Sequence, residues 1–147
     1  MDLMPTILEA CDLPVPEGVE GASLMGELTG AAPLNRAYLH GEHSGSREQS
    51  NQWIVTPHDK YIWFTRTGME QYFDLDADPR EEHDLIDAPE RAARIAVLRA
   101  CLIEELAGRE EGYVRDGELV AGRAPAVMLE RPRPRASNVK RKAYPWI

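Results

Sequence analysis

Three segments between residues 52 and 75 are rich in aromatic and β-branched residues, and only short turn sequences separate them. Turns as short as Pro57-His58-Asp59 and Thr67-Gly68-Met69 join strands that lie antiparallel and side by side. The pattern therefore predicts a β-meander. Both phenylalanines and two of the three tryptophans lie in this region, so we expect the core here. The predicted strands are residues 52–56, 60–66 and 70–75, with a candidate first strand at 36–41.

Residues 90–107 have the strongest helical pattern in the chain. Four apolar residues recur along one face of this segment, Asp87 and Glu90 have the spacing of a capping box, and Gly108 follows as a stop. An apolar stripe of this length must be buried, and the face of the meander is the large surface available to it. The stripe consists of Ile95, Leu98, Leu102 and Leu106.

These patterns predict an α+β fold, in which a small antiparallel β-sheet of three to four strands is covered by a C-terminal helix. An amphipathic helix at residues 2–11, capped by Asp2, precedes the sheet. A proline loop follows this helix, and then a short helix at residues 24–28 that Gly30 closes. After residue 112, a brief pairing at 114–120 and then several prolines predict an extended arm.

The arm carries a charge opposite to that of the rest of the chain. Residues 131–147 contain six basic residues and no acidic one, so against a net charge of −8 the remainder carries −14. We expect the arm to lie on the acidic body of its own or a neighbouring chain. Nucleic acid is a less favoured partner, because the sequence has no recognition helix and no interleaving of aromatic and basic residues. We expect no membrane partner, because no run approaches the roughly 18 apolar residues of a membrane helix.

The cluster His40-Gly41-Glu42-His43-Ser44 is the strongest candidate for a functional site. It follows a predicted strand and enters a polar loop, residues 41–51, at a position where binding residues often lie. Glu42 and His43 are the two candidate residues. If the strand continued, His40 and Glu42 would point to one side and His43 to the other. The alternative interpretation is a solvated loop without a ligand.

The other polar and thiol side chains favour structural roles. Asp74, Asp76 and Asp78 begin like a calcium-binding EF-hand loop, but Pro79 stands where glycine is needed and Leu85 where the bidentate glutamate is needed. We therefore expect these acids to accept backbone hydrogen bonds in turns. The sequence contexts also predict buried structural thiols at Cys11 and Cys101, and solvated edge charges at Lys60 and Arg66.

Two stretches of the chain, considered together, resemble the C-terminal part of the formylglycine-dependent sulfatases. The first runs from Asp2-Leu3-Met4-Pro5-Thr6-Ile7-Leu8 through Leu13-Pro14 and Gly18 to Gly21, Ser23-Leu24 and Leu28. The second combines Trp53 and Lys60-Tyr61-Ile62 with Glu70-Gln71-Tyr72-Phe73-Asp74-Leu75, Asp78-Pro79, Glu82 and Asp84-Leu85. The resemblance spans roughly residues 2–107, and its specificity lies in the order and spacing of the pieces.

The resemblance implies that catalysis belongs to a larger N-terminal domain of alkaline-phosphatase-like fold. In that domain a cysteine or serine in a C-x-P-x-R motif becomes formylglycine, and a calcium ion neutralises the sulfate. Cys11 and Cys101 do not fit this motif, and the paired metal carboxylates have no match. We therefore expect a sulfatase fragment that has neither nucleophile nor metal site and is inactive alone. Calcium and formylglycine are expected in the full-length enzyme, whose substrate the sequence does not indicate.

This interpretation predicts three parts: a helix and loop at 1–34 from the end of the missing catalytic domain, a C-terminal subdomain at 35–110, and a basic arm at 111–147. The missing catalytic domain is the expected partner. The first helix would be uncovered without it, so we also expect a homo-oligomer, formed through this helix or through exchange of the C-terminal arm. The alternative is a free-standing interaction module whose arm binds an acidic partner. The chain has no signal segment, which makes the cytoplasm the default location.

Overall fold

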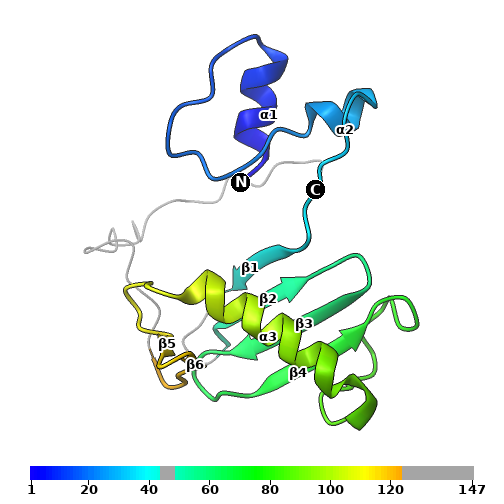
Figure 1. The fold of residues 1–147 in the computed structure, drawn as a ribbon, viewed down its shortest axis with the longest axis vertical. Helices are drawn as coiled ribbons and strands as arrows, with labels where there is room; N and C mark the ends of the chain where they lie inside the picture. Colours follow the sequence, from blue (N-terminus) through cyan, green and yellow to red (C-terminus); the bar gives the residue numbers. More distant parts are fainter. Residues whose placement is uncertain (44–48, 124–147) are drawn as a thin grey trace, which may run out of the picture.

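The computed structural model describes residues 1–43 and 49–123. It confirms the α+β fold, with two N-terminal helices, a four-stranded antiparallel sheet, a long helix on one face of that sheet, and a small hairpin (Figure 1). The basic segment 131–147 and the loop residues 44–48 lie outside the described residues. Within the described ranges, no helix is long and apolar enough to cross a membrane.

The sheet is the meander that the sequence predicts. Its strands are β1 (Leu39–His43), β2 (Asn51–Val55), β3 (Asp59–Phe64) and β4 (Glu70–Asp74), and their order in the sheet is their order in the chain. Alternate side chains of β2 and β3 are buried, as expected when one face of a sheet is covered. The covered face therefore carries Gln52, Ile54, Asp59, Tyr61 and Trp63.

Helix α3 (Ala92–Leu106) covers this face, and its predicted stripe of one isoleucine and three leucines is fully buried. Tyr113, which follows the helix, is buried in the same core and packs nearly perpendicular to the ring of Trp63, at 5.7 Å between ring centroids. The predicted capping box is wrong. A 3-10 turn, η1 (Pro89–Arg91), begins the helical segment, and no side chain caps either η1 or α3. The proline supplies a first helical residue that needs no N–H acceptor, so the Asp87 side chain is not required as a cap.

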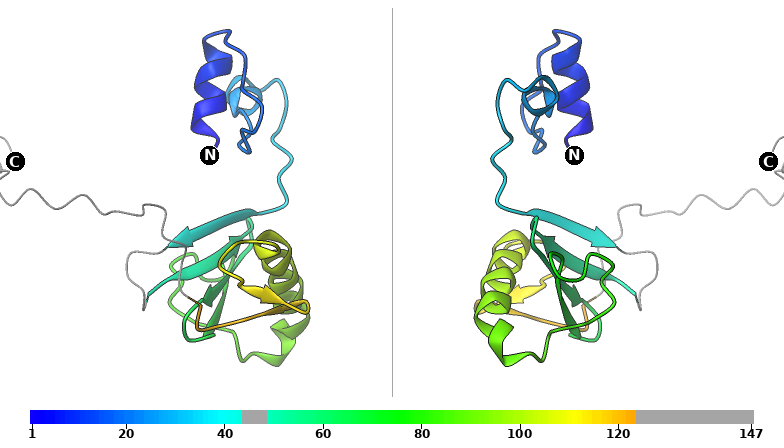
Figure 2. Two further views of the ribbon diagram at one scale, coloured as in Figure 1. Left: turned by 90° about the vertical axis from the view of Figure 1, so that its left-hand side faces the viewer. Right: turned by 90° about the vertical axis from the view of Figure 1, so that its right-hand side faces the viewer.

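The N-terminal helices form a separate layer. Helices α1 (Leu3–Ala10) and α2 (Met25–Thr29) pack on each other, and the chain from residue 30 to residue 38 connects them to the sheet (Figure 2). Gly30 closes α2 in the left-handed conformation, as predicted. Asp2 does not cap α1 through its side chain. Its carboxylate instead accepts hydrogen bonds from the Ala22 amide and from both terminal nitrogens of Arg36.

Strand β1 lies further along the chain than predicted. The expected strand was 36–41 followed by a loop from residue 41, whereas the observed strand is Leu39–His43. Gly41 pairs with Trp53 on β2, and a Cβ on this glycine would lie 1.9 Å from the tryptophan ring. The glycine therefore makes room for a large side chain inside regular sheet, where sequence reasoning interpreted it as the start of a loop.

Beyond α3, two short strands, β5 (Val114–Arg115) and β6 (Glu118–Leu119), form a hairpin. This hairpin confirms the brief pairing predicted at 114–120. The turn that joins α3 to the hairpin contains Arg109 and Glu111 and lies near the edge of the sheet formed by β1.

Candidate functional site

The polar residues of β1 are divided between the two faces of the sheet. His40 and Glu42 both contact Gln52 of β2, a buried residue on the face covered by α3. His43 lies one position further on and is exposed. The prediction that His40 and Glu42 would share a side in a strand is confirmed, whereas the assignment of Glu42 and His43 to a loop is wrong.

Hydrogen bonds along this face fix where the protons lie. The carboxylate of Glu42 can only accept, so the amide nitrogen of Gln52 faces it, at 3.2 Å from Oε2. The Gln52 carbonyl oxygen then faces Nε2 of His40 at 2.9 Å, and that ring nitrogen must carry a proton. His40 is therefore held as a donor to the sheet, with its other ring nitrogen turned toward α3.

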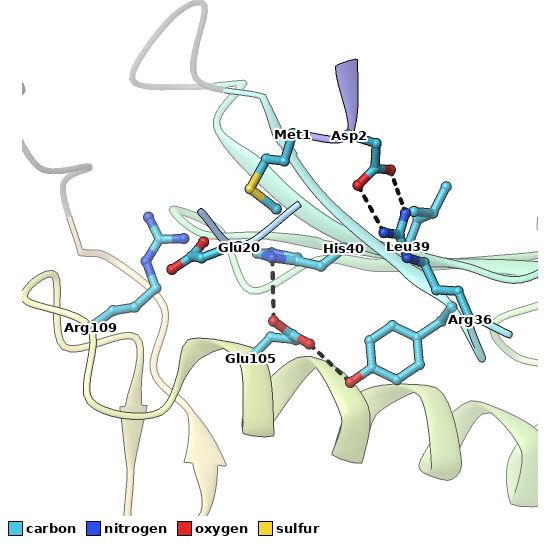
Figure 3. A pocket seen from close by; sticks show the side chains of 9 residues that line it. Met1, Asp2, Glu20, Arg36, Leu39, His40, Glu105 and Arg109 are labelled. Carbon is cyan, nitrogen blue, oxygen red and sulfur yellow. Dashed lines mark hydrogen bonds and ion pairs between the residues drawn. The ribbon is translucent and has the colours of Figure 1, made fainter. Parts of the chain in front are cut away.

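Glu105 of α3 faces the other ring nitrogen of His40, Nδ1. Its Oε2 lies 3.9 Å from Nδ1 of His40, and its Oε1 accepts a hydrogen bond from the Tyr38 hydroxyl at 2.9 Å (Figure 3). Burial and the neighbouring Glu105 carboxylate raise the pKa of Tyr38 to about 12. The Tyr38 hydroxyl is therefore a proton donor throughout the neutral range.

Arg109 connects the turn after α3 to β1. Its Nη1 lies 3.0 Å from Oε2 of Glu42, and its Nε and Nη2 donate to the two carboxylate oxygens of Glu111. The hydrogen bond to Glu111 is the main cause of a raised pKa at Arg109. This contact could not be predicted from the sequence, because residues 42 and 109 are far apart in the chain.

Of these residues, Tyr38, His40, Glu105 and Arg109 border an open cleft of about 680 Å³ between the N-terminal layer and the sheet (Figure 3). Acidic and basic side chains both line this cleft, so a ligand there would meet hydrogen-bond donors as well as acceptors. The residues that line the cleft include Glu20, Arg36, Tyr38, His40, Glu105 and Arg109. A second cleft of about 510 Å³ is lined by Leu24, Leu34, Leu39 and Val55 among others.

The acidic turn after β4 has the structural role predicted for it. Oδ1 of Asp74 accepts the amides of Asp76 and Ala77, and Oδ2 of Asp78 accepts the amide of His83. Across residues 1–43 and 49–123, no group of three or more acidic, histidine or cysteine side chains could hold a metal ion. The residues described here do not fit the calcium site that the sulfatase resemblance implies for a full-length enzyme.

The two cysteines are unpaired thiols in this structure. Cys11 is exposed at the end of α1, which corrects the prediction that it is buried, and Cys101 is partly buried beside the core. Cys11 follows the last residue of α1. It is exposed because residues 1–34 have almost no core in which to bury it, and Pro5 is the one buried residue of α1. Neither cysteine lies in the sequence context that formylglycine formation requires.

Sequence reasoning also missed several ion pairs around the sheet, among them those of Arg94, Arg99 and Lys60. Arg94 of α3 donates to both oxygens of the buried Asp59, and Arg99 forms a similar pair with Glu70. Lys60, expected to be solvated, instead contacts Glu81 at 2.8 Å and lies 5.8 Å from the Trp53 ring centroid. These pairs fasten α3 and the acidic turn to the sheet and do not border the polar cleft.

Comparison with known proteins identifies clear relatives. The chain is 47% identical over 121 residues to the arylsulfatase of Clostridium perfringens (strain 13 / Type A), an alignment that covers 82% of this chain. Among solved structures, a 2-O glycosaminoglycan sulfatase aligns with a TM-score of 0.66 and 25% identity over 82% of this chain. A protein solved in complex with its substrate D-glucosamine-2-N,6-O-disulfate aligns with a TM-score of 0.64 and 26% identity over 71% of this chain.

The chain spans about a quarter of the length of these relatives: 25% of the arylsulfatase, 27% of the 2-O sulfatase and 23% of the protein with the disulfated glucosamine. No family model matches the chain.

Proposed function

We propose, on the premise that this chain is a relative of the sulfatase family, that it forms the C-terminal part of a sulfuric ester hydrolase. The observation that carries the proposal is the 47% identity to the Clostridium arylsulfatase over 82% of this chain. In the intact enzyme, the remaining part would supply the nucleophile and the metal site. This chain would supply a wall of the substrate cleft, and it would be inactive alone.

The exposed surface of the N-terminal layer supports this proposal. Leu3 and Ile7 of α1 are 74% and 61% exposed, and Leu28 at the end of α2 is 71% exposed. Apolar side chains gathered in this way on a protein surface usually mark an interface. We infer that the catalytic part of the enzyme covers this layer and also fills the apolar cleft beside Leu34 and Val55.

Glu42 and His43 are the residues that we propose for the rim of the substrate cleft. A carboxylate repels a sulfate group, so Glu42 would contact the alcohol part of the ester and accept hydrogen bonds from it. His43 points to the opposite face of the sheet and would contact a different part of the substrate. A hydrogen bond to a charged group contributes about 1.5–3 kcal/mol, so the loss of Glu42 should raise KM more than it lowers kcat.

Complementation tests the proposal directly. A version of the Clostridium arylsulfatase that lacks the segment matched by this chain would be co-expressed with this chain and assayed on a chromogenic aryl sulfate. We expect activity above that of the truncated enzyme alone. Ile7→Glu in α1 should abolish the gain by placing a charge in the interface, whereas Val97→Glu on the exposed side of α3 should not. An absence of any gain would contradict the proposal.

The chain alone provides the complementary measurement. Purified chain, incubated with an aryl sulfate and calcium, should show no turnover above buffer. Calcium-dependent turnover by the chain alone would contradict the assignment of the catalytic groups to the missing part.

A further inference from the structure

The guanidinium of Arg109 holds two carboxylates of different burial at once. Through Nε and Nη2 it binds Glu111, whose side chain is only 6% exposed, at 3.2 Å and 2.7 Å. Its remaining terminal nitrogen, Nη1, lies 3.0 Å from Oε2 of Glu42, whose side chain is 46% exposed. Arg109 is therefore anchored at its buried side and extends one donor to a carboxylate that solvent can reach.

This arrangement requires arginine. A guanidinium is planar and carries five N–H donors in fixed directions, so it can bind one carboxylate with two donors and a second carboxylate with a third. A lysine has one nitrogen, which could approach either carboxylate but would not fix the orientation of both. The orientation of Glu42 thus depends on the turn after α3, which is remote from β1 in the sequence.

Both donors near Glu42 contact the same carboxylate oxygen, Oε2. The amide nitrogen of Gln52 and Nη1 of Arg109 each contact Oε2, at 3.2 Å and 3.0 Å. Within residues 1–43 and 49–123, no group donates a hydrogen bond to Oε1 of Glu42. The carboxylate is thus held from one side, and its second oxygen can accept a hydrogen bond from a ligand.

We propose that Arg109 is a positioning residue for substrate selection, and that it holds Glu42 so that Oε1 accepts a hydrogen bond from a hydroxyl on the alcohol part of a sulfate ester. This inference rests on the proposed function. It adds a substrate class, namely sulfate esters whose alcohol part carries a hydroxyl donor close to the ester oxygen. Arg109 itself acts through Glu42 and does not contact the substrate.

The test uses a chimera in which this chain replaces its matched segment in the Clostridium arylsulfatase. Two chromogenic substrates would be compared: para-nitrophenyl sulfate, which has no further hydroxyl, and nitrocatechol sulfate, which has one beside the ester. The measured quantity is the ratio of kcat/KM for nitrocatechol sulfate to that for para-nitrophenyl sulfate. In Arg109→Gln we expect this ratio to fall by about tenfold, mainly through the KM for nitrocatechol sulfate, because one hydrogen bond to a charged group is lost.

A double-mutant cycle separates positioning from general support of the fold. Glu42→Gln should lower the same ratio as Arg109→Gln does, and the double variant should lower it no further. Arg109→Lys should restore little of the ratio, because lysine cannot hold both carboxylates. Arg80→Gln, a matched change at an exposed arginine, should leave the ratio as in the unaltered chimera. Glu42→Gln keeps the pair between Arg109 and Glu111 intact, so it serves as the test if Arg109→Gln does not fold.

The outcomes are distinguishable. An inactive chimera would overturn the proposed function and this inference with it. An active chimera whose substrate ratio is unchanged in Arg109→Gln and in Glu42→Gln would overturn this inference alone. A fall in the ratio that Arg109→Gln still causes in the Glu42→Gln background would also overturn it, since Arg109 would then act by another route.

Discussion

Asp59, the first residue of β3, is a charged side chain that is almost fully buried. Its carboxylate accepts hydrogen bonds from Arg94, from the Thr56 hydroxyl at 2.5 Å and from the Tyr72 hydroxyl at 3.2 Å. Burial alone would raise the pKa of Asp59, but the hydrogen bonds from Arg94 and Thr56 outweigh it and lower the pKa below its usual value of 3.8. The folded protein therefore stabilises the ionised form of Asp59.

We predict that Asp59→Asn lowers the free energy of unfolding by about 2 kcal/mol at neutral pH, the scale of hydrogen bonds to a charged group. The value is modest because the Arg94 side chain is 43% exposed and solvent screens its charge. Urea unfolding followed by circular dichroism would measure it. Asp76→Asn is the matched control, since the Asp76 side chain is 68% exposed.

The same residue predicts a pH dependence. Because the pKa of Asp59 is lower in the folded state than in the unfolded state, its contribution is present above pH 3.8 and is lost as the pH falls through the folded-state pKa. The difference in unfolding free energy between the wild-type chain and Asp59→Asn should therefore shrink as the pH is lowered below about 4. A difference that stays constant over this range would contradict the assignment.

Gly41 allows a third prediction at this scale. An added Cβ would lie within 2.4 Å of three ring atoms of Trp53, so Gly41→Ala should displace the ring and lower stability by about 1–3 kcal/mol. The Trp53→Val change removes the ring, and Gly41→Ala should cost clearly less in that background. Thermal or urea unfolding of the four chains in this cycle would measure the coupling. Equal costs in both backgrounds would show that the contact with Trp53 is not the reason for the glycine.

Among the secondary-structure elements, the apolar patterns predicted β2, β3, β4 and α3 correctly, because each pattern coincides with a buried face. The predicted position of β1 was wrong because the residues of this strand are mostly polar and include Gly41. Its pairing depends on the backbone of β2, and a polar sequence does not indicate such pairing. The predicted cap at the start of the helical segment was also wrong, because the spacing of Asp87 and Glu90 fits a capping box that the 3-10 turn η1 makes unnecessary.

The candidate site was predictable only in part. The spacing of His40 and Glu42 within one segment indicated that they would share a face if the segment were a strand. Their partners Gln52, Glu105 and Arg109 come from three other parts of the chain. The contacts with Gln52 arise from the pairing of β1 with β2, and those with Glu105 and Arg109 from the packing of α3 and its following turn on the sheet. The sequence predicts this packing in outline but not residue by residue.

Helix α3 provides a prediction at the scale of an element. Leu98 is 1% exposed at the centre of the contact with the sheet, so Leu98→Ala should lower the free energy of unfolding by about 2–5 kcal/mol. Val97, the preceding residue on the same helix, is 50% exposed, and Val97→Ala should change stability by less than about 0.5 kcal/mol. Denaturant midpoints of the two variants would measure the difference. Similar losses in both would contradict the packing of α3 described here.

At the scale of the whole molecule, the large exposed apolar residues of ranges 1–43 and 49–123 are concentrated in the first 28 positions. Without a covering part, we expect the chain to self-associate through α1. Sedimentation at micromolar concentration should detect species larger than the monomer. Ile7→Glu should shift the population toward monomer, while Met69→Glu, at a similarly exposed residue of the sheet layer, should not. A wild-type chain that is monomeric and binds no dye specific for apolar surface would contradict this expectation.

The meander has a consequence for how the chain folds. Every strand of the sheet pairs with its immediate neighbour in the chain, and α3 follows the sheet after only the acidic turn and η1, so most contacts of residues 39–106 join positions that are close in sequence. Chains with such local contacts close short loops and cross a low entropic barrier, and they fold faster than chains with distant pairings. The sheet layer should therefore fold early. In a longer protein, the sheet and α3 would already be folded before the N-terminal helices dock on the part of the protein that covers them.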